Sequence, residues 1–326
     1  MRVKGVRIDS RSPVKQAARL SRRAPPLTAV EMPRPSLIGV EVTVLVDDYA
    51  GFSRLLAEHG FSVYLSLSYD DGSKYRVLFD TGRSGRVLLE NASSLRLSLE
   101  EVDAVVLSHR HYDHAGGLPA LLEKAGFKPV VAHPDVVKPS YADSGGFKRF
   151  SVALPAKAWE EVAGGSELVL TRAPLELAPG AWFLGEVERI YDNSYAVKGF
   201  YTLSGGEVVE DKLLDDTGLA VRVGDKALLV AGCSHSGISN LVRKALLVTG
   251  ARTVTVIGGL HLAGATAEEV ERVVSELSSL GVEEIHAGHC TGLRGEAALL
   301  KAFGGRAHRI HSGYRLALPG KAEPRE

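Results

Sequence analysis

The segment SHRHYDHAGG, residues 108–117, most strongly restricts how this chain can fold. It places three histidines and an aspartate within six positions, directly after the apolar run AVVLS. In an extended stretch, side chains two positions apart face the same side, so His109 and His111 can offer imidazoles to one cation. A turn directly afterwards can bring Asp113 and His114 to a neighbouring position. Burying such polar groups without a partner is unfavourable, so the pattern predicts a metal site at a strand end.

Three further histidines follow apolar strands downstream and are candidate ligands from elsewhere in the chain. His235 follows ALLVAGCS, His261 follows VTVIGGL, and His289 follows EEIHAG. We expect these strands to lie in one sheet, where the imidazoles can converge, although a histidine at a strand end can also simply cap a hydrogen bond. Imidazole and carboxylate ligands suit Zn²⁺, with Fe²⁺ or Mn²⁺ as alternatives, as one or two ions. The remaining histidines are interpreted as structural or surface residues: His59, His133, His286, His308 and His311.

Hydroxyl and thiol groups beside these histidines are further candidates. Ser234, Ser236 and Thr291, together with His261, are predicted to contact the substrate, although serine and threonine at such turns are also ordinary capping residues. Cys233 is either a thiolate ligand or a small buried residue.

Short apolar strands alternate with helical patterns along most of the chain. Hairpins mixed with βαβ units indicate an α/β fold in which sheets are flanked by helices. Residues 134–215 are predicted to be an irregular, lid-like insertion that contains one strand, GAWFLGEV. We expect strands at 40–46, 61–69, 74–80, 103–108, 128–133, 219–224, 226–232, 252–259, 283–289 and 308–318, and helices at 116–125, 237–249, 266–280 and 293–302.

The predicted globular domain spans residues 37–318, between a basic N-terminal extension at 1–36 and a C-terminal tail at 319–326. Lys+Arg and Asp+Glu both number 39, so no basic field indicates nucleic acid as a partner. No run of about 18 apolar residues is present, so we expect no membrane span. The two cysteines cannot form a disulfide framework and favour a cytoplasmic location. The sequence leaves the oligomeric state open.

Several motifs together resemble the metallo-β-lactamase superfamily over residues 40–318. These motifs are LFDTG, SHRHYDHAGGL, DDTGLAV, GCSHSGISN, IGGLHL and HCTG. As a set they resemble the branch that contains archaeal dihydropterin–ribofuranosylaminobenzene phosphate synthases and metal-dependent hydrolases. The resemblance implies a four-layer αββα sandwich with a one- or two-metal site along one edge.

The resemblance also implies roles for individual residues. Asp80 would hold the histidine loop by hydrogen bonds instead of binding an ion directly. The implied ligands are His109 and His111 for a first ion, and Asp113, His114 and His289 for a second.

Two departures from the superfamily pattern affect the remaining ligands. The superfamily has a histidine in an H-T-x-G context, where this chain has Asp215, Asp216, Thr217 and Gly218. It also has a bridging aspartate after a glycine, where this chain has Gly232 followed by Cys233. His235 is a candidate to replace one of these ligands. Whether Cys233 or Asp216 is a ligand stays open at this stage.

The predicted function is hydrolysis of an ester or phosphoester by a metal-activated water. The substrate is predicted to be a small, anionic molecule. Asp113 and Asp80 are the candidate catalytic residues, Asp113 by orienting the water and accepting its proton. A pterin synthase that displaces diphosphate is one alternative, and a metal-containing ligand-binding protein without catalysis is another. The two Asp-Thr-Gly tripeptides, at 80–82 and 216–218, resemble an aspartic protease, but that interpretation leaves the HRHYDH segment unexplained.

Overall fold

The computed structural model describes residues 34–51, 54–143 and 149–319. By internal contacts the chain divides into Met1–Arg34 and Pro35–Glu326, and everything below concerns the second unit. Most of the predicted N-terminal extension and nearly all of the predicted C-terminal tail lie outside the described residues.

The first sheet has seven strands and is built mainly from the N-terminal half of the chain. Strands β1 to β3 pair antiparallel, whereas β3, β4, β5 and β8 run parallel. One face of the sheet packs on α1 (Arg86–Leu95), α3 (Leu118–Ala125) and α4 (Ala156–Gly165), around buried Leu78, Leu88 and Leu121. In order across the sheet, the strands are β18 (Arg315–Pro319), β1 (Leu37–Val46), β2 (Ser62–Tyr69), β3 (Lys74–Phe79), β4 (Ala104–Val106), β5 (Lys128–Ala132) and β8 (Ser166–Leu170).

The second sheet also has seven strands and comes from the C-terminal half. Strands β14 to β17 run parallel, and β13 pairs antiparallel with β14. Its outer face packs on α6 (Ile238–Thr249), α7 (Ala267–Ser279) and α8 (Gly292–Phe303). In order, the strands are β17 (Ala307–Arg309), β16 (Val282–Gly288), β15 (Thr253–Gly259), β14 (Lys226–Ala231), β13 (Gly218–Val223), β10 (Ala181–Phe183) and β9 (Leu175–Ala178).

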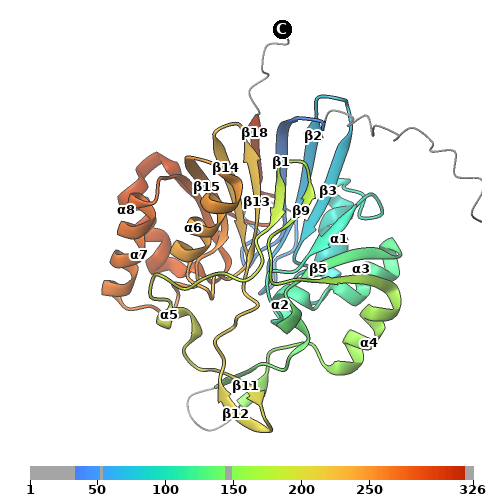
Figure 1. Cartoon of the computed structure of the whole chain (residues 1–326), viewed down its shortest axis with the longest axis horizontal. Coiled ribbons are helices and arrows are strands. Elements are labelled where there is room, and N and C mark those ends of the chain that lie inside the picture. The colour runs from blue at the N-terminus through green and yellow to red at the C-terminus, as the bar shows by residue number, and fades with distance from the viewer. Residues whose placement is uncertain (1–33, 52–53, 144–148, 320–326) are drawn as a thin grey trace, which may run out of the picture. The chain divides into compact units, whose positions relative to one another are not determined.

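The inner faces of the two sheets pack against each other. Phe61 and Leu65 from the first sheet side and Leu219 and Val230 from the second share one buried cluster. This alternation of inward-facing apolar residues along both sheets gives each sheet one face for its partner and one for its helices. The layers are therefore helix, sheet, sheet, helix, as Figure 1 shows, and the predicted αββα sandwich is confirmed.

The prediction that residues 134–215 are irregular is wrong for much of that segment. Besides α4, it contains β8, β9 and β10, which extend the two main sheets. Of these, β10 lies within the predicted strand GAWFLGEV, whereas β8 and β9 are so short that they carry little periodicity, and the sequence did not reveal them. A separate four-stranded sheet runs β12 (Glu207–Glu210), β11 (Phe200–Ser204), β6 (Tyr141–Asp143) and β7 (Arg149–Ser151), and the other short elements are α2 (Tyr112–Ala115), α5 (Ser194–Val197), η2 (Pro134–Val137), η3 (His289–Thr291) and η4 (Gly304–Arg306).

The single strand predicted at 308–318 is also wrong. A turn in which Gly313 has a φ of 85° divides the segment. The first part, β17, joins the second sheet, and the later part, β18, joins the first. The sequence pattern does not separate the two strands, because apolar and polar residues alternate on both sides of the turn. Among the described helices, none has the length and the apolar run that crossing a membrane requires.

Candidate metal centre

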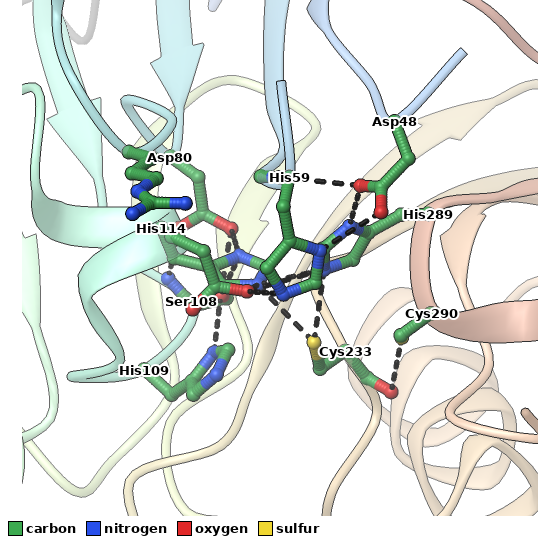
Figure 2. Close-up of polar contacts among 12 residues, drawn as sticks. Asp48, His59, Asp80, Ser108, His109, His114, Cys233, His289 and Cys290 are labelled. Carbon is green, nitrogen blue, oxygen red and sulfur yellow. Dashed lines mark hydrogen bonds and ion pairs between the residues drawn. The ribbon is translucent and has the colours of Figure 1, made fainter. Parts of the chain in front are cut away.

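The predicted site residues meet where parallel strands of both sheets end. The 108–114 segment follows β4 in the first sheet, and His235, His261 and His289 follow β14, β15 and β16 in the second. Since parallel strands deliver the residues after their carboxyl ends to one edge of a sheet, the two edges together form one polar centre inside an otherwise apolar sandwich. Figure 2 shows the labelled side chains of this centre pointing toward one another.

His109, His111 and His235 form what we call the first group. One ring nitrogen from each lies within 4.8 Å of the others, and all three residues are buried. The Nδ1 atom of His235 donates to the Ala196 carbonyl at 2.5 Å, which leaves Nε2 as a bare acceptor. The Nε2 atoms of His109 and His235 are buried and have no hydrogen-bond partner among the described residues. Unpaired buried nitrogens that converge in this way are what a cation site requires.

The protonation state of the first group also suits a cation. Burial lowers the pKa of His111 to about 3. Burial, reinforced by neighbouring imidazoles, holds the pKa values of His109 and His235 well below 6.5. All three rings are therefore neutral near pH 7, and a neutral imidazole is the form that binds a metal.

Asp113, His114, Cys233 and His289 form the second group, and their ligand atoms also lie within 4.8 Å of one another. His114 Nε2 is 3.2 Å from His289 Nε2 and 3.1 Å from Cys233 Sγ. The Asp113 carboxylate lies 3.4 Å from His114 Nε2 and 3.5 Å from His289 Nε2. Burial opposes the charged form of His114, but Asp113 and Asp80 outweigh it and raise its pKa to about 9. The second group thus attracts positive charge, and a divalent cation can compensate the charge of its carboxylate.

Asp80 contacts the side of the His114 ring that faces away from the ligand atoms of the second group. Its carboxylate accepts from the Ser108 backbone N–H, the Ser108 hydroxyl and His114 Nδ1–H, each at 2.7 Å. The last bond leaves His114 Nε2 facing the centre, as in a carboxylate–histidine–metal arrangement. These contacts are those of the hydrogen-bonding role that the resemblance implied for Asp80, and a catalytic role for Asp80 stays a prediction.

Sequence reasoning missed Asp47, Asp48 and His59. Asp48 accepts from Nδ1 of His289 at 2.7 Å and pairs with Nδ1 of His59 at 2.8 Å. The buried Asp47 accepts from the His289 backbone N–H at 3.0 Å, and burial raises its pKa to about 7. His59 Nε2 lies 3.4 Å from the Asp113 carboxylate and is partly exposed. The available signal was the pair of aspartates directly after the apolar strand VEVTVLV, which is the same context as the other site residues.

The backbone around the centre is locally strained. Asp80, Ser234, His261 and His289 have φ values of 58°, 63°, 52° and 48°, in the left-handed region that L-residues seldom adopt. Strain of this kind persists only where the surrounding contacts impose it, and it gathers at functional sites. Gly232 has a related role, because a Cβ there would lie 2.2 Å from Ser108 Oγ. Only glycine lets the end of β14 approach the histidine loop this closely.

A buried ion-pair network holds the histidine loop from the other side. The Arg110 guanidinium donates to the carboxylates of Asp211 and Asp215, and the Arg110 backbone N–H also donates to Asp215. Ser140 donates to Asp211 at 3.0 Å and lies 3.3 Å from His111 Nε2. The loop that replaces the superfamily's H-T-x-G motif therefore acts as a support of the first group.

Asp216 is not part of either group. One of its carboxylate oxygens accepts from the backbone and the hydroxyl of Ser236, at 2.8 and 2.6 Å. Among the described residues it joins no cluster with ligand spacing, whereas Cys233 does. Of the two residues that the sequence left open, Cys233 has ligand spacing in the structure and Asp216 does not.

The predicted substrate contacts differ in burial. Ser234, Ser236 and Thr291 are fully buried and bond to the protein itself: Ser234 donates to the Gly259 carbonyl, and Thr291 accepts from a backbone N–H. Their hydroxyl groups are thus engaged within the protein, and their contact with a substrate stays a prediction. His261 is only half-buried, and its ring packs on that of His235 with centroids 4.2 Å apart.

An open cleft of about 880 Å³ adjoins the centre. Phe200 lies between them, with its ring 4.8 Å from that of His111 and 5.1 Å from that of His235. Tyr201 and the exposed side chains of Lys198 and Lys212 also line the cleft. The arrangement places aromatic, cationic and acidic side chains next to two groups of possible metal ligands.

Comparisons with known proteins agree with this architecture. The sequence profile of the metallo-β-lactamase superfamily matches residues 62–242. The 7,8-dihydropterin-6-methyl-4-(β-D-ribofuranosyl)-aminobenzene-5'-phosphate synthase of Methanocaldococcus jannaschii is 34% identical over 281 residues, covering 84% of this chain and 95% of that protein. An uncharacterized protein of the same organism is 31% identical over 254 residues, or 78% of this chain and 91% of its own.

A solved structure is similar over nearly the same region. Tm1679, described as a metal-dependent hydrolase of the β-lactamase superfamily, has 29% identity and a TM-score of 0.72, covering 86% of this chain and 99% of its own. The sandwich, the two groups of ligand-type side chains at its edge and these relatives lead to one assignment. The chain belongs to the metallo-β-lactamase superfamily.

Proposed function

We propose that this chain is a metal-dependent hydrolase that acts on a small anionic ester or phosphoester. The observation that carries the proposal is the pair of adjacent ligand groups. The first offers only neutral imidazoles, while the second combines imidazoles with a carboxylate. The proposed ligands are His109, His111 and His235 in the first group and Asp113, His114 and His289 in the second. Zn²⁺ is the proposed ion, because His-rich sites that leave positions open are typical of catalytic zinc.

Bound metal would supply a nucleophilic water at neutral pH and charge stabilisation for the reacting group. The chain's own residues prepare the site for that chemistry. Asp80 and Asp48 accept from Nδ1 of His114 and His289 and so keep the two Nε2 atoms facing inward. The Asp113 carboxylate is positioned to orient a water and accept its proton. The partly exposed His59, 3.4 Å from Asp113, is positioned to pass that proton to solvent.

The small sheet and the cleft are proposed to select the substrate. Phe200 of β11 covers the first group, so this part of the 134–215 insertion is proposed to act as a lid. Lys198 and Lys212 are exposed in the cleft beside acidic residues such as Glu210 and Glu269, and the two lysines are proposed to contact the anionic group of the substrate. The free thiols of Cys233 and Cys290 favour a reducing, cytoplasmic setting.

A second candidate function is transfer to a pterin with loss of diphosphate. Its support is the 34% identity to the Methanocaldococcus jannaschii synthase across 95% of that protein. Both candidates need the same ligand groups, but they differ in the nucleophile. Water attacks in the hydrolase, whereas an aromatic amine substrate attacks in the synthase.

The proposal is tested by metal analysis and a substrate panel on one preparation. The purified chain should retain Zn²⁺ and turn over phosphodiesters or lactones, and a pterin diphosphate with an aminobenzene acceptor tests the second candidate. His111→Ala should lose turnover and bind metal at least 10- to 100-fold more weakly, because removing a ligand is at least as damaging as removing an outer partner. His308→Ala, outside both groups, is the control. Full turnover by metal-free protein would refute both candidates.

A further inference from the structure

We propose that Glu284, His286 and His308 form a separate cation site, at the edge of the second sheet, that binds Zn²⁺ or a similar transition-metal ion. One ligand atom from each of the three residues lies within 4.8 Å of the other two. None of the three belongs to the two ligand groups of the metal centre. The edge site, as we call these three residues, therefore does not depend on the proposed function.

Strand pairing brings the three side chains of the edge site together. Glu284 and His286 are two positions apart on β16, so their side chains face the same side of the sheet. His308 lies on the edge strand β17, opposite His286 in the register. The rings of His286 and His308 stack with centroids 4.8 Å apart and planes inclined by 13°, which is the spacing of neighbouring strands. The backbone thus holds two imidazoles and one carboxylate side by side.

The distances within the edge site are close to those of a metal coordination sphere. Glu284 Oε1 lies 2.9 Å from His308 Nε2 and 3.5 Å from His286 Nε2. Ligand atoms of a tetrahedral Zn²⁺ are about 3.3 Å apart, given Zn–N distances of about 2.0–2.1 Å. The side chains of Glu284 and His308 are each 36% exposed, so an ion can enter from solvent and water can complete its coordination.

His286 supplies an independent observation that points to a ligand. The residue is 1% exposed, and its Nε2 atom has no hydrogen-bond partner among the described residues. Its Nδ1 atom lies 2.8 Å from the Tyr314 hydroxyl, which can accept the ring proton and leave Nε2 as a bare acceptor. Buried polar atoms without a partner are rare in folded proteins. Nε2 of His286 is therefore oriented and available for a cation.

The alternative is an ion pair between Glu284 and His308 with no metal. That pair would satisfy two of the residues but would leave the buried Nε2 atom of His286 without a partner. A cation bound between the three ligand atoms satisfies all of them. Imidazole ligands suit Zn²⁺, whereas Mg²⁺ and Ca²⁺ prefer oxygen ligands. A bound ion would also hold β17, which has only three residues, against β16.

The test is chemical modification of His308 in the full-length chain after chelation. Diethyl pyrocarbonate acylates accessible neutral imidazoles, and mass spectrometry of peptides gives the rate at His308, with the partly exposed His311 as the internal reference. Added Zn²⁺ should slow the modification of His308, whereas Mg²⁺ should not. Glu284→Ala should require at least about 10-fold more Zn²⁺ for the same protection, because losing a ligand weakens binding at least as much as losing an outer partner.

Glu283→Ala is the matched control for Glu284→Ala. Glu283 is the preceding residue of β16, and its side chain pairs with Lys226 and not with the two histidines. Protection of His308 by Zn²⁺ should be unchanged in this variant. In equilibrium dialysis, His308→Ala should bind one equivalent of Zn²⁺ fewer than the wild type. It should keep full turnover and so remains a control for the metal centre.

Three results would overturn the edge site. The first is a modification rate of His308 that is the same with and without Zn²⁺ in the wild type. The second is protection that Glu284→Ala leaves unchanged, which would exclude the carboxylate as a ligand. The third is equal Zn²⁺ stoichiometry in the wild type and His308→Ala. The wild-type rates decide the first point even if a variant fails to fold, and circular dichroism checks the folding of each variant.

Discussion

Asp80→Asn isolates the contribution of one outer hydrogen bond to metal affinity. Asparagine has the same shape as aspartate and tolerates the left-handed conformation at this position, where φ is 58°. Its carbonyl oxygen can still accept from the Ser108 backbone N–H. Its amide NH₂, however, takes the place of the oxygen that accepts from the Ser108 hydroxyl and from His114 Nδ1–H. The substitution therefore replaces one hydrogen-bond acceptor by a donor and leaves the backbone unaffected.

The expected consequence follows from the tautomer of His114. The Ser108 hydroxyl can rotate and accept, but the imidazole must place its proton on Nε2 to avoid two facing donors. Nε2 is the atom that lies 3.2 Å from His289 Nε2 in the second group, and a protonated Nε2 cannot bind a cation. Loss of such an outer partner lowers metal affinity about 10- to 100-fold. That change corresponds to about 1.4–2.8 kcal/mol.

The assay is a competition titration of Zn²⁺ between the protein and a chromophoric chelator at pH 7. Asp71→Asn, in the exposed turn between β2 and β3, is the matched control and should leave the affinity unchanged. Circular dichroism and thermal unfolding of the metal-free variants show whether a weaker Zn²⁺ affinity results from a loss of folding. A Zn²⁺ affinity for Asp80→Asn within about threefold of the wild type would refute the tautomer argument, since 10-fold is the lower bound for an outer partner.

Two further predictions concern stability. Arg110→Ala should lower the free energy of unfolding by about 3–5 kcal/mol in urea titrations, because it leaves two buried carboxylates without their cation; Arg76→Ala, at an exposed ion pair, should change it by less than about 1 kcal/mol, and equal effects would contradict the argument. Burial lowers the pKa of His286 to about 4 in the folded state. Because the unfolded chain takes up that proton first, stability should fall as the pH drops from about 6.5 to about 4, by up to about 3 kcal/mol. His286→Gln should reduce this fall but not abolish it, because the lowered pKa values of His109, His111 and His235 add to it, and an unchanged slope would refute the contribution of His286.

Much of the site was accessible from residue spacing. The separation of His109 and His111 from Asp113 and His114 follows from two local facts, an extended stretch after a strand and a helical turn directly afterwards. The structure has His111 in an extended conformation, with φ −65° and ψ 146°, and the turn α2 begins at the next residue. Local geometry of this kind depends on neighbours in the chain, so a sequence pattern can predict it.

Residues that contact the site from other parts of the chain were harder to find. Asp48 and His59 support the second group from the segment after β1, and only the pair of aspartates at the end of that strand marks this segment in the sequence. Arg110 lies inside the recognised motif, yet its partners are about 100 residues away in a loop of unusual sequence. The internal hydrogen bonds of Ser234 and Thr291 could not be foreseen, because a hydroxyl that bonds within the protein and one that binds a substrate look alike in sequence.

The sequence by itself determined the layered fold class and the motif that concentrates ligand-type side chains, because apolar periodicity and local spacing act within short stretches of chain. Only the tertiary structure decided which distant residues complete each group. His235 joins His109 because β14 and β4 end at the same edge, and Cys233 enters the second group because Gly232 allows two sheets to approach closely. Those contacts depend on how the two sheets pack against each other. This packing is set by the whole interior of the sandwich and not by any single segment.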